Sequence, residues 1–460
     1  MDTTYKVRIH KTDVYKSRKK NGSNTYWVRW EVDGKRFKEP FKHSALAESF
    51  RSDLVAASRR GEAFRHIDGL PVSAARNGAD MTWYDFACAY VDMKWPRSAG
   101  TTRRTHAESM TTLTMSMLAD KRGKPEDKQL RRALTRWGFN TARRDEAKGA
   151  EREALKWLQA HTLSVSALRD PATLRRVLDG LTVQLDGKPA APTVTRRKRS
   201  VFSTSLGYAI ELGILDENPI PALKWSPPKT AGTVDRRRVA SPMQVRTLLN
   251  AVSTQQRTGK RLVAFFGCLY YAAMRPEEAA ALRKANLALP EEGWGEILLD
   301  RAEPHAGSEW TDSGTNRDDR GLKHRASDDT RVVPSPPELT ALLHAHVAAY
   351  GTAPDGRLFR GERSASELPK ITIWRAWQRA RREVFAPEAL ASPLAGTPYD
   401  LRHAMLSTWL NGGVPPTDVA EWAGNSVEVL LSVYAKCLDG GDAMKRKLVE
   451  AALGHGPARP

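Results

Sequence analysis

The chain has 460 residues, of which 40% are hydrophobic and 27% charged, a globular composition that excludes an intrinsically disordered protein. At this length, two to four domains are expected rather than one compact core. Lysine and arginine number 73 against 53 aspartates and glutamates, so the formal net charge is +20. An excess of this size favours a polyanionic partner, nucleic acid first, although a generally basic protein without such a partner also fits.

The three cysteines, Cys88, Cys268 and Cys437, lie far apart and form no paired spacing, so neither a disulfide framework nor a zinc site is predicted. Residues 1–6 lack the apolar stretch of a signal peptide. No run approaches the roughly 20 apolar residues that a membrane span needs. The sequence therefore predicts a cytoplasmic protein that does not enter a membrane.

Residues 1–70 predict an N-terminal module built from a three-stranded sheet and one helix. Residues 26–32 alternate in strand fashion and run into Asp33-Gly34, a strong hairpin-turn signal, from which 35–38 return. An earlier strand near residues 5–9 completes the sheet. Strands with interleaved aromatic and basic side chains suit insertion into a DNA groove, whereas a solvated sheet face is the alternative.

The helix of this module is expected to have Ser44 as its N-cap and to end near Gly61. Leu46, Phe50 and Leu54 then share the face that packs on the sheet. The cations of the module are Lys11, Lys16, Arg18, Lys19, Lys20, Arg29, Lys35, Arg36 and Lys38. Their density favours contact with a polyanion.

Residues 80–225 predict an all-helical domain. Thr82 opens its first helix, which Pro96 stops. We expect the polar stretch 120–151 to be a loop-rich insertion. A later helix begins near Thr193 with a basic first turn, whose cations contact phosphate or are simply solvated.

Residues 226–240 predict an interdomain linker, because prolines, glycine and a run of arginines interrupt any periodic pattern. A second large domain follows over residues 241–455. Its first helix has a firm start, since Ser241 and Gln244 form a capping-box pair with Pro242 between them.

One candidate site residue is Arg275, which follows a thoroughly apolar helix over residues 262–271. Pro276 begins the next helix, so Arg275 lies at the junction of two helices. A buried cation needs a partner, and Glu278, three residues on, can orient its guanidinium. A purely structural Arg–Glu pair would explain this junction equally well.

A second candidate is Arg402, which lies near the start of a helix with an apolar stripe. At that position its side chain and nearby free backbone N–H groups can converge on one phosphate. Only short helices join Arg402 to Tyr434, so both can reach one cleft. A lone tyrosine is usually a core or surface residue, and Tyr434 stands out because of the residues that precede it.

Taken together, these segments resemble the tyrosine recombinase (phage integrase) family, which includes the integrases of mobile genetic elements. The resemblance covers about residues 240–455, and in it Asn425 precedes Tyr434 by nine residues, as the family pattern requires. Residues 80–225 look like the family's helical core-binding (SAM-like) domain, and residues 1–70 look like its arm-type DNA-binding domain. The segments that carry the resemblance are Arg275 with Glu278, Asp400-Leu401-Arg402-His403, Ala423-Gly424-Asn425-Ser426 and Val433-Tyr434.

The resemblance implies a mainly α fold with small β-sheets (α+β) and a mixed α/β catalytic domain. It implies a site-specific DNA recombinase that integrates or excises a mobile element, in which Tyr434 attacks DNA and forms a 3′-phosphotyrosine. Arg275 and Arg402 would hold the phosphate, because planar guanidiniums match its oxygens. The implied partners are double-stranded attachment sites, a homo-tetramer on DNA, and an excisionase or DNA-bending factor. No cofactor or metal is implied, and the sequence has no metal-ligand cluster or phosphate-cradling glycine loop.

The family also uses a lysine in a β-hairpin between its two arginines. Residues 294–299 and 330–334 predict two strands, and Lys323 lies between them. Lys323 is therefore aligned with the general acid that protonates the leaving 5′-oxygen. The connection is long for a hairpin, and a solvated loop lysine is the alternative.

Two positions depart from the family pattern. Tyr399 stands where the first histidine is usual, and a phenol is a poor base at neutral pH. Asn425 stands where histidine or tryptophan is usual, and it can donate to a phosphate oxygen without titrating. His403 follows Arg402 directly and is interpreted as structural.

Three other functions fit parts of the sequence. A DNA-binding relative that no longer cuts, with an accessory or regulatory role, is favoured by Tyr399 and Asn425. A type IB topoisomerase-like enzyme would use similar chemistry without partner exchange, and the N-terminal module argues against it. An RNA-binding protein would require that the joint spacing of the motifs is accidental.

Overall fold

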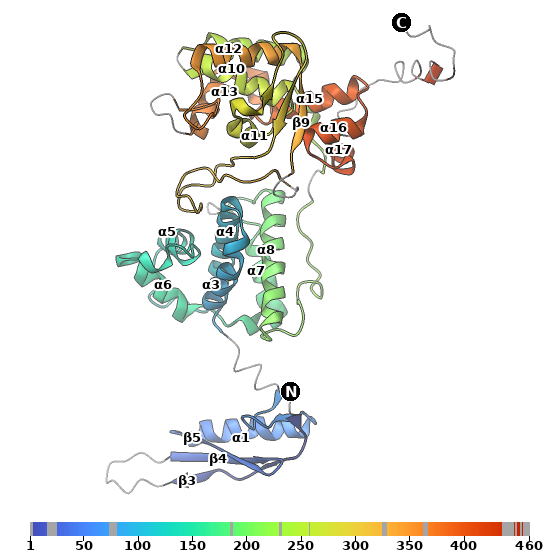
Figure 1. The fold of residues 1–460 in the computed structure, drawn as a ribbon. Helices are drawn as coiled ribbons and strands as arrows, with labels where there is room; N and C mark the ends of the chain where they lie inside the picture. The colour runs from blue at the N-terminus through green and yellow to red at the C-terminus, as the bar shows by residue number, and fades with distance from the viewer. Residues whose placement is uncertain are drawn as a thin grey trace. The chain divides into compact units, whose positions relative to one another are not determined.

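The computed structural model describes residues 3–15, 25–72, 81–184, 187–229, 232–256, 258–323, 329–361, 367–434, 446, 449–450 and 453. Helices dominate it and the sheets are small and antiparallel (Figure 1), which confirms the predicted mainly α fold. The chain divides into two compact units, Met1–Pro96 with Thr105–Pro228 and Arg97–Arg104 with Lys229–Pro460. None of the described helices combines the length and the apolar character of a membrane span.

The N-terminal module is a sheet centred on β4. One edge of β4 pairs with both β2 and β3, and the other edge pairs with β5. The three predicted strands are thus present as β2, β4 and β5, and β3, which was not predicted, makes a fourth strand of the sheet. Asp33 and Gly34 both have positive φ, 45° and 86°, as a tight hairpin turn between β4 and β5 requires. The elements are β1 (Thr3–Thr4), β2 (Val7–Ile9), β3 (Asp13–Tyr15), β4 (Thr25–Val32), β5 (Lys35–Phe41), β6 (Phe64–Arg65) and α1 (Ser44–Arg59).

Helix α1 differs from its prediction at its start and on its face. His43, in an extended conformation, is the N-cap, so the prediction of Ser44 was wrong. Of the three residues expected to face the sheet, Leu54 is buried and Phe50 packs edge-on against Trp30, but Leu46 is 55% exposed. Ala47 and Ala57 are buried in addition, because small alanines let the helix approach the sheet. The end near Gly61 is confirmed, since Arg60 is the C-cap.

The helical part of the first unit surrounds an aromatic core of Trp83, Phe86, Tyr90 and Phe202, all buried. Thr82 caps the first of these helices by accepting a hydrogen bond from the backbone of Asp85. The helices are α3 (Trp83–Lys94), α4 (Gly100–Ser116), α5 (Asp127–Ala133), α6 (Gly149–His161), α7 (Pro171–Gly180) and α8 (Pro192–Glu211). Short helical turns cover Trp95–Arg97, Leu134–Gly138, Arg144–Glu146 and Val165–Arg169.

The expectation of a loop-rich insertion over residues 120–151 was wrong. Helix α5, the turn Leu134–Gly138 and the start of α6 lie in this stretch. Leu130 and Leu134 are fully buried, so two apolar side chains one turn apart suffice to anchor a largely polar helix.

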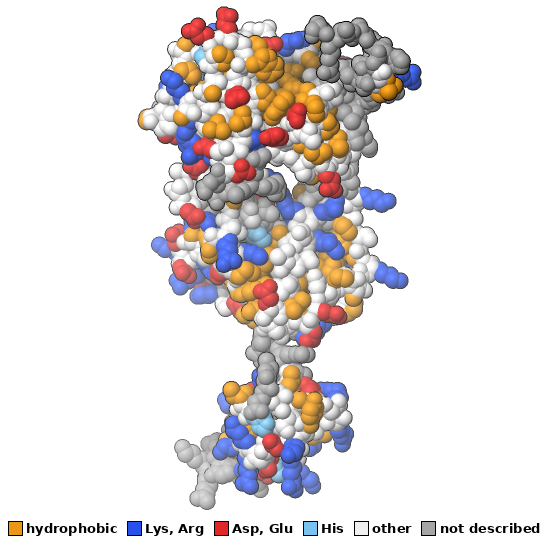
Figure 2. Space-filling model, turned by 45° about the vertical axis from the view of Figure 1, so that its right-hand side comes forward, with side chains coloured by type: hydrophobic (Ala, Val, Ile, Leu, Met, Phe, Trp, Pro, Cys, Tyr) orange, Lys and Arg blue, Asp and Glu red, His pale blue; other side chains and the backbone are white. Residues whose placement is uncertain are grey.

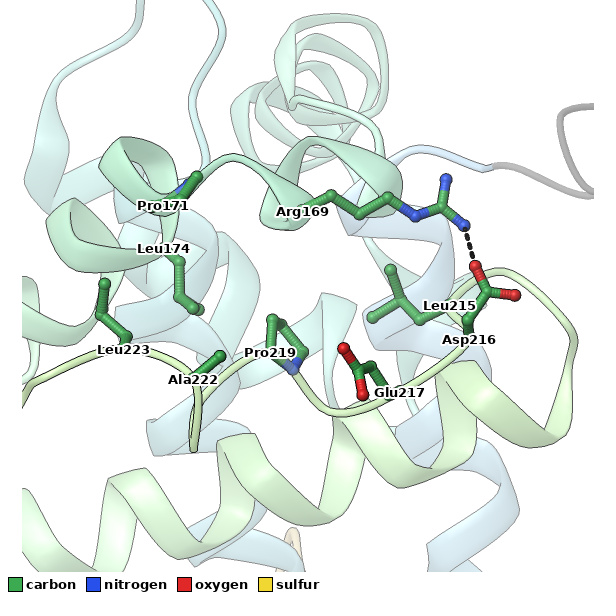
Figure 3. Close-up of a pocket in the computed structure, with 9 residues that line it drawn as sticks. All are labelled: Arg169, Pro171, Leu174, Leu215, Asp216, Glu217, Pro219, Ala222 and Leu223. Atoms are coloured by element: carbon green, nitrogen blue, oxygen red, sulfur yellow. Dashed lines mark ion pairs between the residues drawn. The ribbon is translucent and has the colours of Figure 1, made fainter.

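A hollow of about 420 Å³ lies in the same helical part (Figure 3). Its walls are mainly proline, leucine and alanine side chains. At its edge Arg169 forms an ion pair with Asp216 at 3.5 Å and donates a hydrogen bond to the carbonyl oxygen of Ile214 at 2.8 Å.

The second unit is built around α10, which is buried among α9, α12, α13 and α15. Strands β7, β8 and β9 form its antiparallel sheet in that order, and residues 300–330 connect β8 to β9. The capping box of Ser241 and Gln244 is confirmed. The helices are α9 (Pro242–Thr254), α10 (Thr258–Tyr271), α11 (Pro276–Ala281), α12 (Pro337–Tyr350), α13 (Lys370–Val384), α14 (Pro387–Ala391), α15 (Asp400–Asn411), α16 (Pro416–Ala423) and α17 (Val427–Tyr434). The strands are β7 (Leu287–Ala288), β8 (Gly295–Leu299) and β9 (Arg331–Ser335), and short turns cover Arg236–Arg238 and Lys284–Asn286.

Candidate active site

Arg275 is held at the junction of α10 and α11. Its backbone is extended there, and Pro276 fixes the start of α11. The side chain is 7% exposed, and its Nη1 donates to Glu278 Oε1 at 2.8 Å. The backbone N–H of Arg275 donates to the other oxygen of the same carboxylate, also at 2.8 Å. One glutamate therefore fixes both the main chain and the guanidinium of Arg275.

Glu278 also binds a second arginine, Arg331, the first residue of β9. Arg331 Nη2 donates to Glu278 Oε2 at 2.8 Å and Nη1 to Oε1 at 3.1 Å. Burial alone would raise the pKa of Glu278, but Arg331, Arg275 and Arg402 outweigh it and hold that pKa at about 2. The carboxylate is thus ionised at neutral pH and bridges two guanidiniums.

Arg402 reaches the same place from the first turn of α15. It is 1% exposed, and its guanidinium donates to the carbonyl oxygen of Ala273 and, at 2.7 Å, to that of Ala423. Burial and the like charge of Arg275 lower the pKa of Arg402, against the opposing effect of Glu278. The two predicted arginines, 127 positions apart in the sequence, are therefore electrostatic neighbours.

Asn425 connects the two guanidiniums. Its Oδ1 accepts a hydrogen bond from Arg275 Nη2 at 3.0 Å and one from Arg402 Nη2 at 3.4 Å. The two cations therefore already converge on a single oxygen atom. A phosphate oxygen is a stronger acceptor of the same kind, so this convergence is the geometry that phosphate binding needs.

Gly424 makes this arrangement possible at the end of α16. It has φ +63° and ψ 46°, a left-handed conformation that favours glycine. A Cβ built on Gly424 would collide with the guanidinium of Arg331 and lie 3.3 Å from Arg275 Nη1. The carbonyl oxygen of Gly424 accepts from Arg275 Nη2 at 2.9 Å. Glycine at this turn lets the main chain approach both cations.

Tyr434, the last residue of α17, lies on the side of Arg402. The side chain is 3% exposed, and its hydroxyl is 2.5 Å from His403 Nδ1. Tyr434 also favours the charged form of Arg402, which opposes the lowering of the pKa of Arg402 by burial and by Arg275. The backbone N–H of Val234 donates to the carbonyl oxygen of Val433 at 2.8 Å, which anchors the end of α17.

Tyr399 and His403 complete the described cluster. The ring of Tyr399 packs edge-on against His403 at a centroid distance of 5.0 Å. Tyr399 favours the charged forms of both Arg275 and Arg402, which tends to raise each pKa. His403 therefore lies between two tyrosine rings. The sequence interpretation treated it as structural and did not anticipate its contact with Tyr434.

Lys323 is placed differently from the other five predicted residues. It is exposed in a turn of the connection between β8 and β9. Within residues 258–323, 329–361 and 367–434, no hydrogen bond or salt bridge joins it to the cluster, and residues 324–328 lie outside the described residues. The structure thus brings together Arg275, Arg402, Asn425, Tyr434 and Tyr399, but not Lys323.

Sequence reasoning missed Arg331. The sequence did contain a signal for it. Alternate residues of β9 are buried and face the core, and Arg331 is a charged residue at one of these inward-facing positions.

Among the described residues no group of three or more histidine, cysteine or carboxylate side chains could hold a metal ion. Cys88 and Cys268 are buried free thiols, as expected, and Cys437 lies outside the described residues.

No protein-family model and no curated protein matches the sequence. Among solved structures, the chain is similar to the Tn1549 transposon integrase bound to transposon right end DNA, with 13% identity and a TM-score of 0.47 over 68% of this chain and 96% of that chain. It is similar to the lambda integrase dimer bound to a COC′ core site, with 12% identity and a TM-score of 0.46 over 92% of this chain and 97% of that chain.

A third similarity is to the XerH site-specific recombinase bound to a palindromic difH substrate, with 12% identity and a TM-score of 0.45 over 80% of this chain and 95% of that chain. All three are integrases or site-specific recombinases in complex with DNA.

Proposed function

We propose that this protein is a site-specific DNA recombinase of the tyrosine type, which integrates or excises a mobile element. One observation carries the proposal: Arg275 and Arg402, both buried, donate to the same side-chain oxygen of Asn425. A tyrosine hydroxyl lies beside the second of these arginines. Buried cations without a full set of acid partners are costly, so a site that keeps two of them together suits an anionic substrate.

The proposed reaction exchanges one ester bond for another. The Tyr434 oxygen attacks the phosphorus of one DNA strand, the bond to the 5′-oxygen breaks, and a 3′-phosphotyrosine forms. Arg275 and Arg402 neutralise the charge that builds up on the non-bridging oxygens. The freed 5′-hydroxyl of a partner strand then reverses the step. Because the ester energy is kept, no ATP is required.

The remaining predicted residues have supporting roles. Asn425 holds the two guanidiniums and can turn its amide N–H groups to a phosphate oxygen. Tyr399 interacts electrostatically with both arginines and would contribute a hydroxyl near the phosphate. Lys323 would protonate the leaving 5′-oxygen. No step needs a metal or an organic cofactor.

The partner is double-stranded DNA at attachment sites. The net charge of +20 supports this, and Figure 2 shows lysine and arginine side chains spread over the N-terminal module. We propose a homo-tetramer on DNA, assisted by an excisionase or a DNA-bending factor. We propose that residues 444–453 dock on a neighbouring copy in this tetramer. Most of this segment lies outside the described residues, and Val449 and Leu453, which are described, are 57% and 68% exposed.

A DNA-binding relative that does not cut is the second candidate. The observation in its favour is that Lys323, the proposed general acid, is exposed and has no hydrogen bond or salt bridge to the arginine cluster among the described residues. Such a protein would use the same cations to hold DNA and would form no covalent bond.

The test is to trap a covalent adduct. Purified protein is incubated with genomic fragments that carry its gene and the natural flanking DNA, and the reaction is stopped with detergent. We expect wild type to retain DNA covalently and Tyr434→Phe to retain none. Tyr350→Phe, which removes a hydroxyl elsewhere in the same unit, is the matched control and should behave as wild type.

Binding without any adduct by wild type would contradict the recombinase and favour the non-cutting protein. Sequencing the trapped ends distinguishes a recombinase, which cuts at one site, from a topoisomerase-like enzyme, which cuts supercoiled DNA at many.

A further inference from the structure

His403 is fixed against the hydroxyl of Tyr434 by its surroundings. Its Nδ1 lies 2.5 Å from the Tyr434 oxygen, a short hydrogen-bond distance. The imidazole packs between two rings, with centroids 5.0 Å from Tyr399 and 5.6 Å from Tyr434. The imidazole therefore has little freedom to turn away from the hydroxyl.

The charge around His403 sets its protonation state. Asp400 and Arg402 face it from its own helix, Arg238 from the segment before α9, Tyr399 from the helix start and Tyr434 from α17. Burial, Arg402 and Arg238 lower the pKa of His403 to about 4, and only Asp400 opposes them. At neutral pH the imidazole is therefore neutral, so Nδ1 can accept a hydrogen bond from the tyrosine.

We infer that His403 accepts the hydroxyl proton of Tyr434 as the tyrosine attacks DNA, an inference that rests on the proposed function. The bond from the tyrosine oxygen to phosphorus forms, the bond from phosphorus to the 5′-oxygen breaks, and the proton moves to Nδ1. The 5′-oxygen takes a proton from the general acid, assigned to Lys323 in the proposed function. In the reverse step Nδ1 returns its proton to the tyrosine.

DNA itself favours this transfer. Protonated His403 carries a positive charge in a buried place that already holds Arg402, so the free protein disfavours it. A phosphate bound between Arg275 and Arg402 brings negative charge to this cluster and stabilises the imidazolium. His403 is thus a weak base in the free protein and becomes a stronger base where its substrate is bound.

The test measures the rate of adduct formation on a duplex that carries the cleavage site mapped by adduct capture. His403→Asn places a non-titrating acceptor near the position of Nδ1, and His403→Ala leaves space for added imidazole. We expect both variants to bind the duplex and to melt as wild type does, yet to react roughly 10²-fold or more slowly. Added imidazole should restore much of the rate of His403→Ala only.

A substrate with sulfur in place of the scissile 5′-oxygen separates the base from the acid. Its leaving group needs no proton, so Lys323→Ala should become fast on this substrate whereas His403→Ala should stay slow. The rate of adduct formation by His403→Asn should also rise about tenfold per pH unit, over the pH range in which the wild-type rate no longer changes with pH.

Adduct formation by His403→Asn and His403→Ala at the wild-type rate would overturn this inference but would leave the proposed function standing. Slow variants that imidazole does not rescue would also overturn it, because His403 would then only position Tyr434. If His403→Ala does not fold, the pH profile of His403→Asn decides in its place. A wild type that forms no adduct would instead overturn the proposed function, and the inference with it.

Discussion

The arginine cluster and the connection between β8 and β9 are built in opposite ways. In the cluster, Arg275, Arg331 and Arg402 are each at most 7% exposed and are held by carboxylate or carbonyl oxygens. In the connection, Lys323 is exposed, and among the described residues no hydrogen bond or salt bridge joins it to the cluster. The groups proposed to bind a phosphate are thus already held in place, while the group proposed to protonate the leaving oxygen is not. Under the proposed function, bound DNA would complete the site.

Even within the connection, the part near the core is fixed. Arg317 donates to the carbonyl oxygens of Glu303 and Leu368, at 2.7 Å each. Glu303 accepts from Arg283 at 3.2 Å and from Arg357 at 3.1 Å. The contrast with the cluster therefore concerns the segment at Lys323 and not the whole connection.

After loss of the Tyr434 hydroxyl, which should abolish the adduct, removing Arg402 should have the largest effect on activity. Arg402→Ala is expected to lower the rate of adduct formation by roughly 10²–10³-fold, because one preorganised donor to the phosphate is lost. DNA affinity should change little, since many other cations contribute to it. The control is Arg379→Ala, which removes an exposed arginine from α13. Recombination by Arg402→Ala at a normal rate would contradict the assigned phosphate clamp.

Removing Arg331 should have the largest effect on stability. Arg331→Met leaves the buried carboxylate of Glu278 with one partner fewer, which costs about 3–5 kcal/mol in the free energy of unfolding. Urea unfolding measures this change. The matched control is Arg301→Met, whose ion pairs with Asp300 and Asp319 are partly exposed and should cost about 1 kcal/mol or less. Equal losses of unfolding free energy in the two variants would contradict the claim that the buried cation contributes more to stability than the exposed one.

Acid should weaken the cluster through Glu278. The pKa of this carboxyl is about 2 in the folded protein and that of an ordinary glutamate is about 4.3, so folding favours the ionised form. Its contribution to stability is present above about pH 5 and is lost as the pH falls toward 2. Unfolding free energies measured across this range should fall less steeply in Glu278→Gln than in wild type. Parallel pH curves for the two proteins would contradict the assignment.

Gly424→Ala tests the turn that brings the chain against the arginines. The new Cβ would strain the left-handed backbone and collide with Arg331, and we expect a loss of about 1–3 kcal/mol in the free energy of unfolding. Gly293→Ala is the control, because Gly293 also has a positive φ of 94° but has nothing within 4 Å of the built Cβ. The excess loss in Gly424→Ala measures the collision, and no excess would mean that the arginines can move aside.

Lys323→Ala should have the smallest effect on stability. Because the side chain is exposed, we expect a change within about 0.5 kcal/mol in the free energy of unfolding. Adduct formation on ordinary DNA should nevertheless slow, if Lys323 is the general acid. A stable variant with an unchanged rate would leave Lys323 a solvated loop lysine and require another acid.

The residues that could be located from the sequence lie next to strong local signals. Pro276 and Gly424 mark helix ends, and they place Arg275 and Asn425 within one or two positions of a fixed boundary. Arg331 could not be found in this way, because its contact with Glu278 depends on the register of β9 against a segment 53 positions away. The contact of His403 with Tyr434 could not be found from the sequence either, because the path of α17 decides which residue of α15 meets Tyr434.

The same limits apply to the fold. The hairpin turn at Asp33-Gly34 and the capping box at Ser241 have local causes, and both are confirmed. The N-cap of α1 and the helices within residues 120–151 depend on packing that no short pattern contains. Lys323 was the hardest residue to place, since the long connection that holds it carries few helix or strand signals.

The most direct test of the central claim is the chemical identity of the covalent bond. Trapped adducts are digested with nuclease and protease, and the peptides are sequenced by mass spectrometry. We predict that a nucleotide remains attached through a 3′-phosphate to the oxygen of Tyr434 and to no other residue. A nucleotide on a different side chain, or DNA that is bound but never joined to the protein, would contradict it.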